Sequence, residues 1–415
     1  MNASPQTAAE TAAADRPQGQ RTDASGAGSS PGLSDRLGVR LALLLTGGVS
    51  LLAGLDAALL LLGLGAPVGA GRLADVHGML MVYGFVGTLV ALERAVALGA
   101  AWALAAPAGF GLGAIALIGA PAVGPARVAP GGALLVIGAA ALVAVYIPLW
   151  RRNHATAVLV QAGGAVAALG GAILFVAGIP VPWLLPWPVA FLVLTIAGER
   201  LELARVAFLN PRVEAAVAGA AVAVLAGVLA ALLWPTAGYR VFAAMLLILA
   251  ALLLRYDVAR GTVRGRGLPR FSAVCLLTGY LWLLVAGGIW AIAGPVRSGP
   301  AYDASAHAVF LGFVISMIFA HAPIILPAVL RRPLPYRPIM YLPVVLLHGS
   351  LLLRIAVGDG AGQLWAVTLG GVLNVVAVLA FLVIAVGSVL LGAQKSADPQ
   401  QGAPKPGAQE TGESA

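Results

Sequence analysis

Three segments of the chain follow one pattern: FVGTLVALER (residues 85–94), FLVLTIAGER (residues 191–200) and FVISMIFAHA (residues 313–322). Aligned without gaps on the phenylalanine, each carries an ionisable residue eight positions later, namely Glu93, Glu199 and His321. The copies lie 106 and 122 residues apart (191 − 85 and 313 − 191). A repeat of this length in a strongly apolar chain predicts three related bundles of about four helices each.

Composition predicts a membrane protein. Hydrophobic residues make up 60% of the chain and charged residues only 10%. Apolar stretches of about 18 or more residues recur, and each is long enough to cross a hydrocarbon core of about 30 Å. We expect an all-helical, polytopic protein of about twelve transmembrane helices in three pseudo-symmetric four-helix arcs. The predicted spans are 39–64, 74–98, 101–121, 131–150, 155–179, 184–208, 213–234, 239–258, 271–293, 303–330, 338–357 and 363–392.

The two ends of the chain differ from its middle. Residues 1–37 are rich in Ala, Ser, Gly, Pro, Thr and Asp and contain no apolar run, which predicts a disordered cytoplasmic tail and not a signal peptide. Residues 393–415 have the same character, and residues 38–392 form the predicted twelve-helix membrane domain. The single cysteine, Cys275, excludes an internal disulfide.

The placement of Lys and Arg predicts the orientation. With the N-terminus inside and twelve spans, the inner segments hold 20 of the 25 basic residues and the outer segments hold 5. This positive-inside bias predicts a multi-pass protein of a bacterial-type inner (cytoplasmic) membrane with both termini cytoplasmic, and an odd number of spans would break it. Topology and contact with anionic membrane lipid explain the net charge of +9, so we expect no nucleic-acid partner.

Four of the five histidines fall within predicted spans. His77 and His307 lie at the outer ends of spans 2 and 10, His321 lies at the inner end of span 10, and His348 lies midway along span 11, whereas His154 is expected to be solvated in an inner loop. An unpaired polar ring is costly in lipid, which raises the expectation of a functional role.

Two of these histidines suggest a cofactor. His77 and His307 share a membrane level, and two imidazoles facing each other across a bundle can hold a haem iron axially. Arg354 is predicted at the same level and could pair with a propionate, so the expected cofactor-binding residues are His77, His307 and Arg354. The neighbouring Gly78, Gly84 and Gly312 are expected to make room for a flat ring. His321 and His348 are the expected members of a second, inner set of metal ligands, with a structural role as the alternative.

The segments DVHGMLMVYGFVGTLVALERAVAL (from Asp75) and DASAHAVFLGFVISMIFAHAPIILPAVL (from Asp303) resemble the histidine-bearing helices of the NnrS family. More distantly, they resemble the catalytic subunit of haem-copper oxidases. In the oxidase subunit, twelve helices form three arcs of four, and a low-spin haem lies between histidines on helices 2 and 10. His307, Ala308, Gly312 and Met317 match the opening of a late helix in NnrS proteins. The resemblance implies a haem, of b type, and a role in redox chemistry or in nitric oxide metabolism or stress.

The chain also departs from the oxidase pattern. The oxidases bind copper through histidines on helices 6 and 7, but spans 6 and 7 here contain none, and Val309 stands two positions after His307 where the oxidase has a second histidine. An oxidase-style copper site is therefore not expected, although copper is a second cofactor to consider. The sequence lacks a Gly-rich phosphate loop, CxxC and HExxH, and no catalytic residue is assigned.

A proton-coupled secondary transporter is the alternative function. Twelve helices are common in transporters, and Glu93, Glu199, Asp56 and His321 would then form the proton path. The same glutamates also fit interfacial ion pairs that end a helix, because each precedes an arginine. The expected partners are membrane lipid together with a small gas or a redox protein.

Overall fold

The computed structural model describes residues 37–120, 129–206, 210–330, 332 and 334–397. All the regular secondary structure of these residues is helical, and they contain no strand. Most of the two predicted tails lies outside the described residues. Eleven helical segments of the described part are long and apolar enough to cross a membrane. The chain is therefore an all-helical, multi-pass membrane protein.

The first third of the chain forms one group of helices. Its elements are α1 (Leu37–Leu61), α2 (Arg72–Met79), η2 (Leu80–Gly87), α3 (Thr88–Leu98), η3 (Ala101–Leu104), α4 (Ala105–Gly119) and α5 (Ala129–Asn153). The segments α2, η2 and α3 follow one another without a break and make up predicted span 2. This long helix stops at Gly99, whose left-handed backbone (φ 75°) bends the chain away from the helix axis.

The middle third contains α6 (Thr156–Val176), α7 (Val181–Leu184), α8 (Pro186–Val206), α9 (Pro211–Leu233) and α10 (Pro235–Tyr256). Helix α9 begins at a capped N-terminus, because the Asn210 side chain accepts a hydrogen bond from the Arg212 amide and Pro211 occupies the first turn. Helix α8 corresponds to predicted span 6 but is not one of the eleven apolar segments. Each of its 18-residue windows carries at least three charged residues, all in its second half.

The last third contains α11 (Ala259–Thr262), α12 (Gly267–Ala293), α13 (Gly299–His307), η5 (Ala308–Ile315), α14 (Ser316–Leu330), η6 (Pro338–Met340), α15 (Tyr341–Leu352), η7 (Leu353–Gly360) and α16 (Leu364–Ala397). The segments α13, η5 and α14 are continuous and make up predicted span 10. Helix α16 runs five residues past the predicted end of the membrane domain at residue 392.

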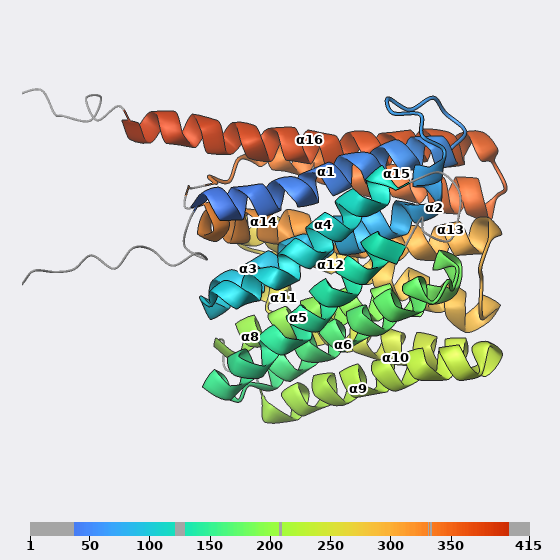
Figure 1. Cartoon of the computed structure of the whole chain (residues 1–415), viewed down its shortest axis with the longest axis horizontal. Coiled ribbons are helices and arrows are strands. Elements are labelled where there is room, and N and C mark those ends of the chain that lie inside the picture. The colour runs from blue at the N-terminus through green and yellow to red at the C-terminus, as the bar shows by residue number, and fades with distance from the viewer. Residues whose placement is uncertain (1–36, 121–128, 207–209, 331, 333, 398–415) are drawn as a thin grey trace, which may run out of the picture. The chain divides into compact units, whose positions relative to one another are not determined.

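Helices that follow one another in sequence lie side by side (Figure 1). Within the first group α4 packs against α5, within the second α6 packs against α8 and α9 against α10, and within the third α15 packs against α16. Contacts of α5 with α6 and of α10 with α12 join the groups in order. Helix α16 in turn packs against α1, so the last group also contacts the first.

The helices that carry the three repeat copies are the most buried. Six consecutive residues of α8, Val189 to Leu194, are at most 1% exposed, so this helix is covered on every side. The long helices Arg72–Leu98 and Gly299–Pro327 have the largest buried share among the eleven apolar segments. Small residues let the surrounding helices approach: a Cβ on Gly109 of α4 would lie against the backbone of Gly138 of α5. The repeat therefore marks the central helices.

Two of the central helices contain π-helical turns in the same register. The segment η2 runs from five residues before Phe85 to two after it, and η5 spans the same positions around Phe313. Helix α8, which carries the third copy, is α-helical throughout. Since π turns inside α-helices occur frequently at functional sites, the two segments direct attention to the space around them.

Candidate functional site

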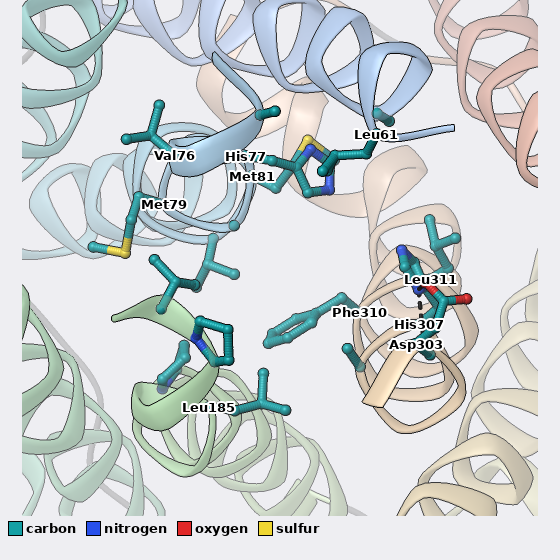
Figure 2. Close-up of a pocket in the computed structure, with 18 of the residues that line it drawn as sticks. Leu61, Val76, His77, Met79, Met81, Leu185, Asp303, His307, Phe310 and Leu311 are labelled. Atoms are coloured by element: carbon teal, nitrogen blue, oxygen red, sulfur yellow. Dashed lines mark hydrogen bonds and ion pairs between the residues drawn. The ribbon is translucent and has the colours of Figure 1, made fainter. Parts of the chain in front are cut away.

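A pocket of 740 Å³ lies beside both π-helical segments. We call it the outer pocket, because it occupies the ends of the helices that the charge pattern predicts to face outward. Residues that line it come from α1, α2, η2, α6, α7, α8, α13, η5, η7 and α16. His77, His307 and Arg354 all line it, so the three predicted cofactor-binding residues meet around one cavity. Most of the other lining side chains are apolar, and Phe310 points into the space (Figure 2).

His77 is held by the neighbouring helix α1. Its Nδ1 lies 2.8 Å from the carbonyl oxygen of Gly54, an acceptor that fixes the ring with Nδ1 protonated. A side chain at Gly54 would collide with Met81, so glycine there lets α1 approach η2 closely. Within the described residues, no hydrogen bond uses the Nε2 atom of His77. The ring is therefore oriented on one side and unsatisfied on the other.

His307 has the same arrangement with a stronger acceptor. Its Nδ1 lies 2.9 Å from the Asp303 carbonyl oxygen and 3.1 Å from Asp303 Oδ1, one helical turn earlier (Figure 2). Its Nε2 also has no hydrogen-bond partner in the described part of the chain. In both histidines the nitrogen left available is Nε2, the atom that commonly binds a metal when Nδ1–H is bonded to a carbonyl or carboxylate.

Arg354 makes a paired contact that the sequence did not indicate. Its Nε and Nη2 donate to the two carboxylate oxygens of Asp303, both at 2.7 Å. The guanidinium is buried, and its Nη1 lies close to the backbone of Gly371 on α16. Asp303 thus joins Arg354 to His307, and a propionate could reach only the donor positions of Arg354 that Asp303 does not use.

Only one of the three glycines expected to accommodate a flat ring lines the pocket. Gly78 does so, facing Val181. A Cβ on Gly84 would instead collide with Ser50 and Ala114 of the adjoining helices, and one on Gly312 with Trp282. The expectation is wrong for Gly84 and Gly312, which permit close helix packing on the sides away from the pocket.

The structure gives His321 and His348 no common partner. His348 uses both ring nitrogens: Trp282 donates to Nδ1 at 2.9 Å, and Nε2 lies 3.0 Å from Thr278 Oγ1. A histidine satisfied in this way behaves as a structural residue. His321 bonds through Nδ1 to the carbonyl of Met317, and its Nε2 is buried without a partner.

His154 is exposed at the end of α5, with its ring edge-on to Trp150 and a positive φ of 46°. It lies outside the pocket, as expected for a surface residue.

The predicted proton path is brought together only in part: Glu93 and Glu199 lie near each other, whereas Asp56 lies apart from them. Asp56 accepts a hydrogen bond from the Val68 amide in the connection after α1. Glu93 pairs with Arg94, whereas Arg200 does not pair with Glu199 but holds Asp257 through two hydrogen bonds of 2.8 and 2.7 Å. The predicted ion pair thus forms at Glu93–Arg94 and not at Glu199–Arg200. Neither position ends a helix, because α3 continues to Leu98 and α8 to Val206.

Gly54 and Asp303 accept hydrogen bonds from the Nδ1 atoms of the two histidines, but the sequence predicted a role for neither residue. Asp303 could have been found, because it lies four positions before His307 and therefore one turn away on the same helix face. Gly54 contributes only a backbone carbonyl from another helix, and no sequence signal identifies such an acceptor.

The eleven long apolar helical segments of the described residues, several of which line this pocket, define a polytopic helical membrane protein. A family model described as a domain of unknown function (DUF8744) matches residues 40–390, and the chain belongs to this family. No curated protein and no solved structure matches the chain.

Proposed function

We propose that this protein binds a haem in the outer pocket, with His77 and His307 as axial ligands, and acts in redox chemistry or nitric oxide metabolism. One observation carries the proposal: two histidines from different central helices line one cavity, and each has Nδ1 anchored and Nε2 available. Paired imidazoles oriented by such acceptors are a common arrangement for haem iron.

The donor set favours a haem over a bare metal ion. Protein sites for a single ion such as zinc use three or four side-chain ligands. The described residues contain no group of three or more His, Cys, Asp or Glu able to hold an ion. A haem supplies its own four nitrogens and needs only the axial positions, which two histidines can fill. The same argument gives no support to a copper site.

The pocket suits a large apolar ligand with polar edges. A volume of 740 Å³ falls within the range of about 300–1,000 Å³ that cofactor sites occupy. Apolar side chains such as Leu185, Phe310 and Leu311 form most of its surface (Figure 2). Arg354 also lines the pocket; its Nε and Nη2 are paired with Asp303, which leaves Nη1 as the donor for an anionic group. These features match the flat hydrophobic face and the anionic propionates of a haem.

In this proposal the chain's own residues orient and tune the site. The Gly54 carbonyl and the Asp303 carboxylate fix the two rings, and the negative charge of Asp303 makes His307 the more electron-rich ligand. Apolar walls exclude water from the ring faces. A bound haem would supply one-electron chemistry and a site for a small gas.

The resemblance to NnrS proteins and to haem-copper oxidases supports the redox and nitric oxide assignment. With α8 counted, the described part of the chain contains twelve long helical segments, packed in sequence order with α16 returning to α1. The π-helical turns at matching positions of spans 2 and 10 support their equivalence in a threefold pseudo-repeat. The proposed architecture is therefore three arcs of four helices that kept one haem site.

The reduced-minus-oxidised visible spectrum of detergent-purified protein from haem-replete cells tests the proposal. We expect the sharp bands of a bis-histidine haem, lost in His77→Ala and in His307→Ala. His154→Ala and His348→Ala are the matched controls, because they remove one histidine without touching the pocket, and both should keep the bands. A colourless, folded wild-type protein would refute the assignment.

A further inference from the structure

A second group of polar side chains lies at the opposite end of the central helices. Its members, which we call the inner cluster, are Glu93 and Arg94 of α3, Tyr146 of α5, Gln161 of α6, and Glu199 and Glu202 of α8. Glu93 follows His77 by 16 residues, about 24 Å along a helix, so the cluster is separate from the outer pocket.

One guanidinium contacts two of the three carboxylates in this cluster. Arg94 pairs with Glu93 through Nη2, and its Nη1 lies 3.3 Å from Gln161 Oε1 and 3.7 Å from Glu202. Gln161, which is fully buried, extends its Nε2 to within 3.4 Å of Glu202. Arg94 therefore balances Glu93, and Glu202 lies beside two donors with about half its side chain (52%) exposed.

Glu199 is left without a counter-charge of its own. Among the described residues it forms no ion pair, and the charged groups that act on it are Glu93, Arg94, Glu202 and the adjacent Arg200. Arg200 is neutralised by its two hydrogen bonds to Asp257, on the α9 and α10 side of α8. Helix α6 contributes only the uncharged Gln161 to this region. The Glu199 side chain is partly buried, so ionising its carboxyl without a paired cation carries a desolvation cost.

The Tyr146 hydroxyl also points to a missing partner. Tyr146 is 2% exposed, and its hydroxyl oxygen has no hydrogen-bond partner among the residues that the structure describes. The charged groups that act on this hydroxyl are those of the cluster, namely Arg94, Glu199, Glu93 and Glu202. A buried hydroxyl near carboxylates can bond to a protonated carboxyl or to an ordered water, and leaving it unpaired is costly.

We propose that the inner cluster is a proton-binding site in which Glu199 holds one exchangeable proton. A proton on the Glu199 carboxylate removes the uncompensated charge and adds an O–H donor to the cluster. A metal ion is a poorer occupant, since the described residues offer no set of three His, Cys, Asp or Glu ligands. The half-exposed Glu202, three residues after Glu199 and therefore one turn away on the same face of α8, connects this part of the cluster with solvent.

Infrared difference spectroscopy of the purified full-length protein, titrated from about pH 5 to about pH 9, tests the proposal. This pH range covers the pKa values that buried glutamates reach. We expect the carbonyl-stretching band of a protonated carboxyl that disappears as the pH rises. Glu199→Gln should remove this band. Glu214→Gln, at the start of α9 and outside the cluster, is the matched control and should retain it.

Two outcomes would overturn the proposal: no pH-dependent carboxyl band in the wild-type protein, or an undiminished band in Glu199→Gln. If Glu199→Gln does not fold, Glu199→Asp keeps the carboxyl and moves it; the band should then shift in frequency, and an unshifted band refutes the assignment. The haem spectrum reports the other end of the bundle, so loss of the haem proposal leaves this test intact.

Discussion

Two aspartates, Asp303 and Asp257, each link several hydrogen-bond donors in this protein. Asp303 accepts from both Arg354 and His307, and Asp257 accepts from Arg200, Tyr280 and the Ala259 amide. In each network one aspartate lies between a buried arginine and a ring. Removing the aspartate would leave the arginine buried without a counter-ion, which is the most expensive way to break such a pair.

Asp303→Asn is expected to lower the free energy of unfolding by roughly 3 kcal/mol, because Arg354 loses its carboxylate partner. It should also raise the reduction potential of a haem bound by His307, since the His307 ring loses the negatively charged Asp303 carboxylate next to its Nδ1. A melting curve and a spectroelectrochemical titration measure the two effects. Asp75→Asn, which also lines the pocket but lies on α2, serves as the control. An unchanged potential in haem-loaded Asp303→Asn would contradict the tuning role.

The environment of the Asp257 carboxyl predicts that the protein loses stability in acid. Burial opposes its ionisation, but the hydrogen bonds and charge of Arg200 outweigh burial and hold the pKa of this carboxyl below its ordinary value of 3.8. A lowered folded-state pKa stabilises the protein fully above pH 3.8, and the contribution disappears as the pH falls through the folded-state value.

Asp257→Asn should therefore melt at a lower temperature than wild type, by a margin that stays constant at neutral pH and narrows below the ordinary pKa. Melting curves across the acid range measure this margin. A margin that widens in acid would contradict the assignment.

At the level of elements, glycine decides how closely helices pack. Gly109 and Gly138 bring α4 and α5 into backbone contact, whereas Gly119, at the end of α4, has open space where a Cβ would lie. The same residue type therefore has two different consequences on one helix.

Gly109→Ala is expected to destabilise the protein by about 1–3 kcal/mol, because the new methyl group would collide with the backbone of Gly138. Gly119→Ala should change stability little and serves as the control. Thermal unfolding in detergent compares the two variants. Equal melting temperatures would show that α4 can shift away from α5 at little cost.

Patterns of hydrophobicity and charge predicted the helices and their order, because a membrane-spanning helix is a run of consecutive, mostly apolar residues. The same reasoning placed His77, His307 and Arg354 at one level, and they line one pocket. It could not predict η2 and η5, since a π turn depends on the packing of the whole helix. Nor could it pair Arg200 with Asp257, 57 positions away, in place of the adjacent Glu199.

For the whole molecule, the side of the membrane on which each later connection lies depends on whether α8 crosses the membrane. Twelve crossings place the α5–α6 and α8–α9 connections on the inner side and the α6–α7 connection on the outer side. Eleven crossings, with α8 not spanning, would reverse everything after it and destroy the excess of Lys and Arg on one side. The buried middle of α8 and its length of 21 residues, about 32 Å, both favour a crossing.

Cysteine labelling in sealed vesicles distinguishes these topologies. Ala177→Cys, exposed after α6, should react with a membrane-impermeant maleimide from the outside, and Arg212→Cys, exposed at the start of α9, only after permeabilisation. The native Cys275 is buried and should stay unlabelled, so the wild-type chain is the control. Labelling of both positions from the same side would mean that α8 does not cross the membrane. In that case the helices that carry His77 and His307 would enter the membrane from opposite sides, and the two histidines could not share the outer pocket.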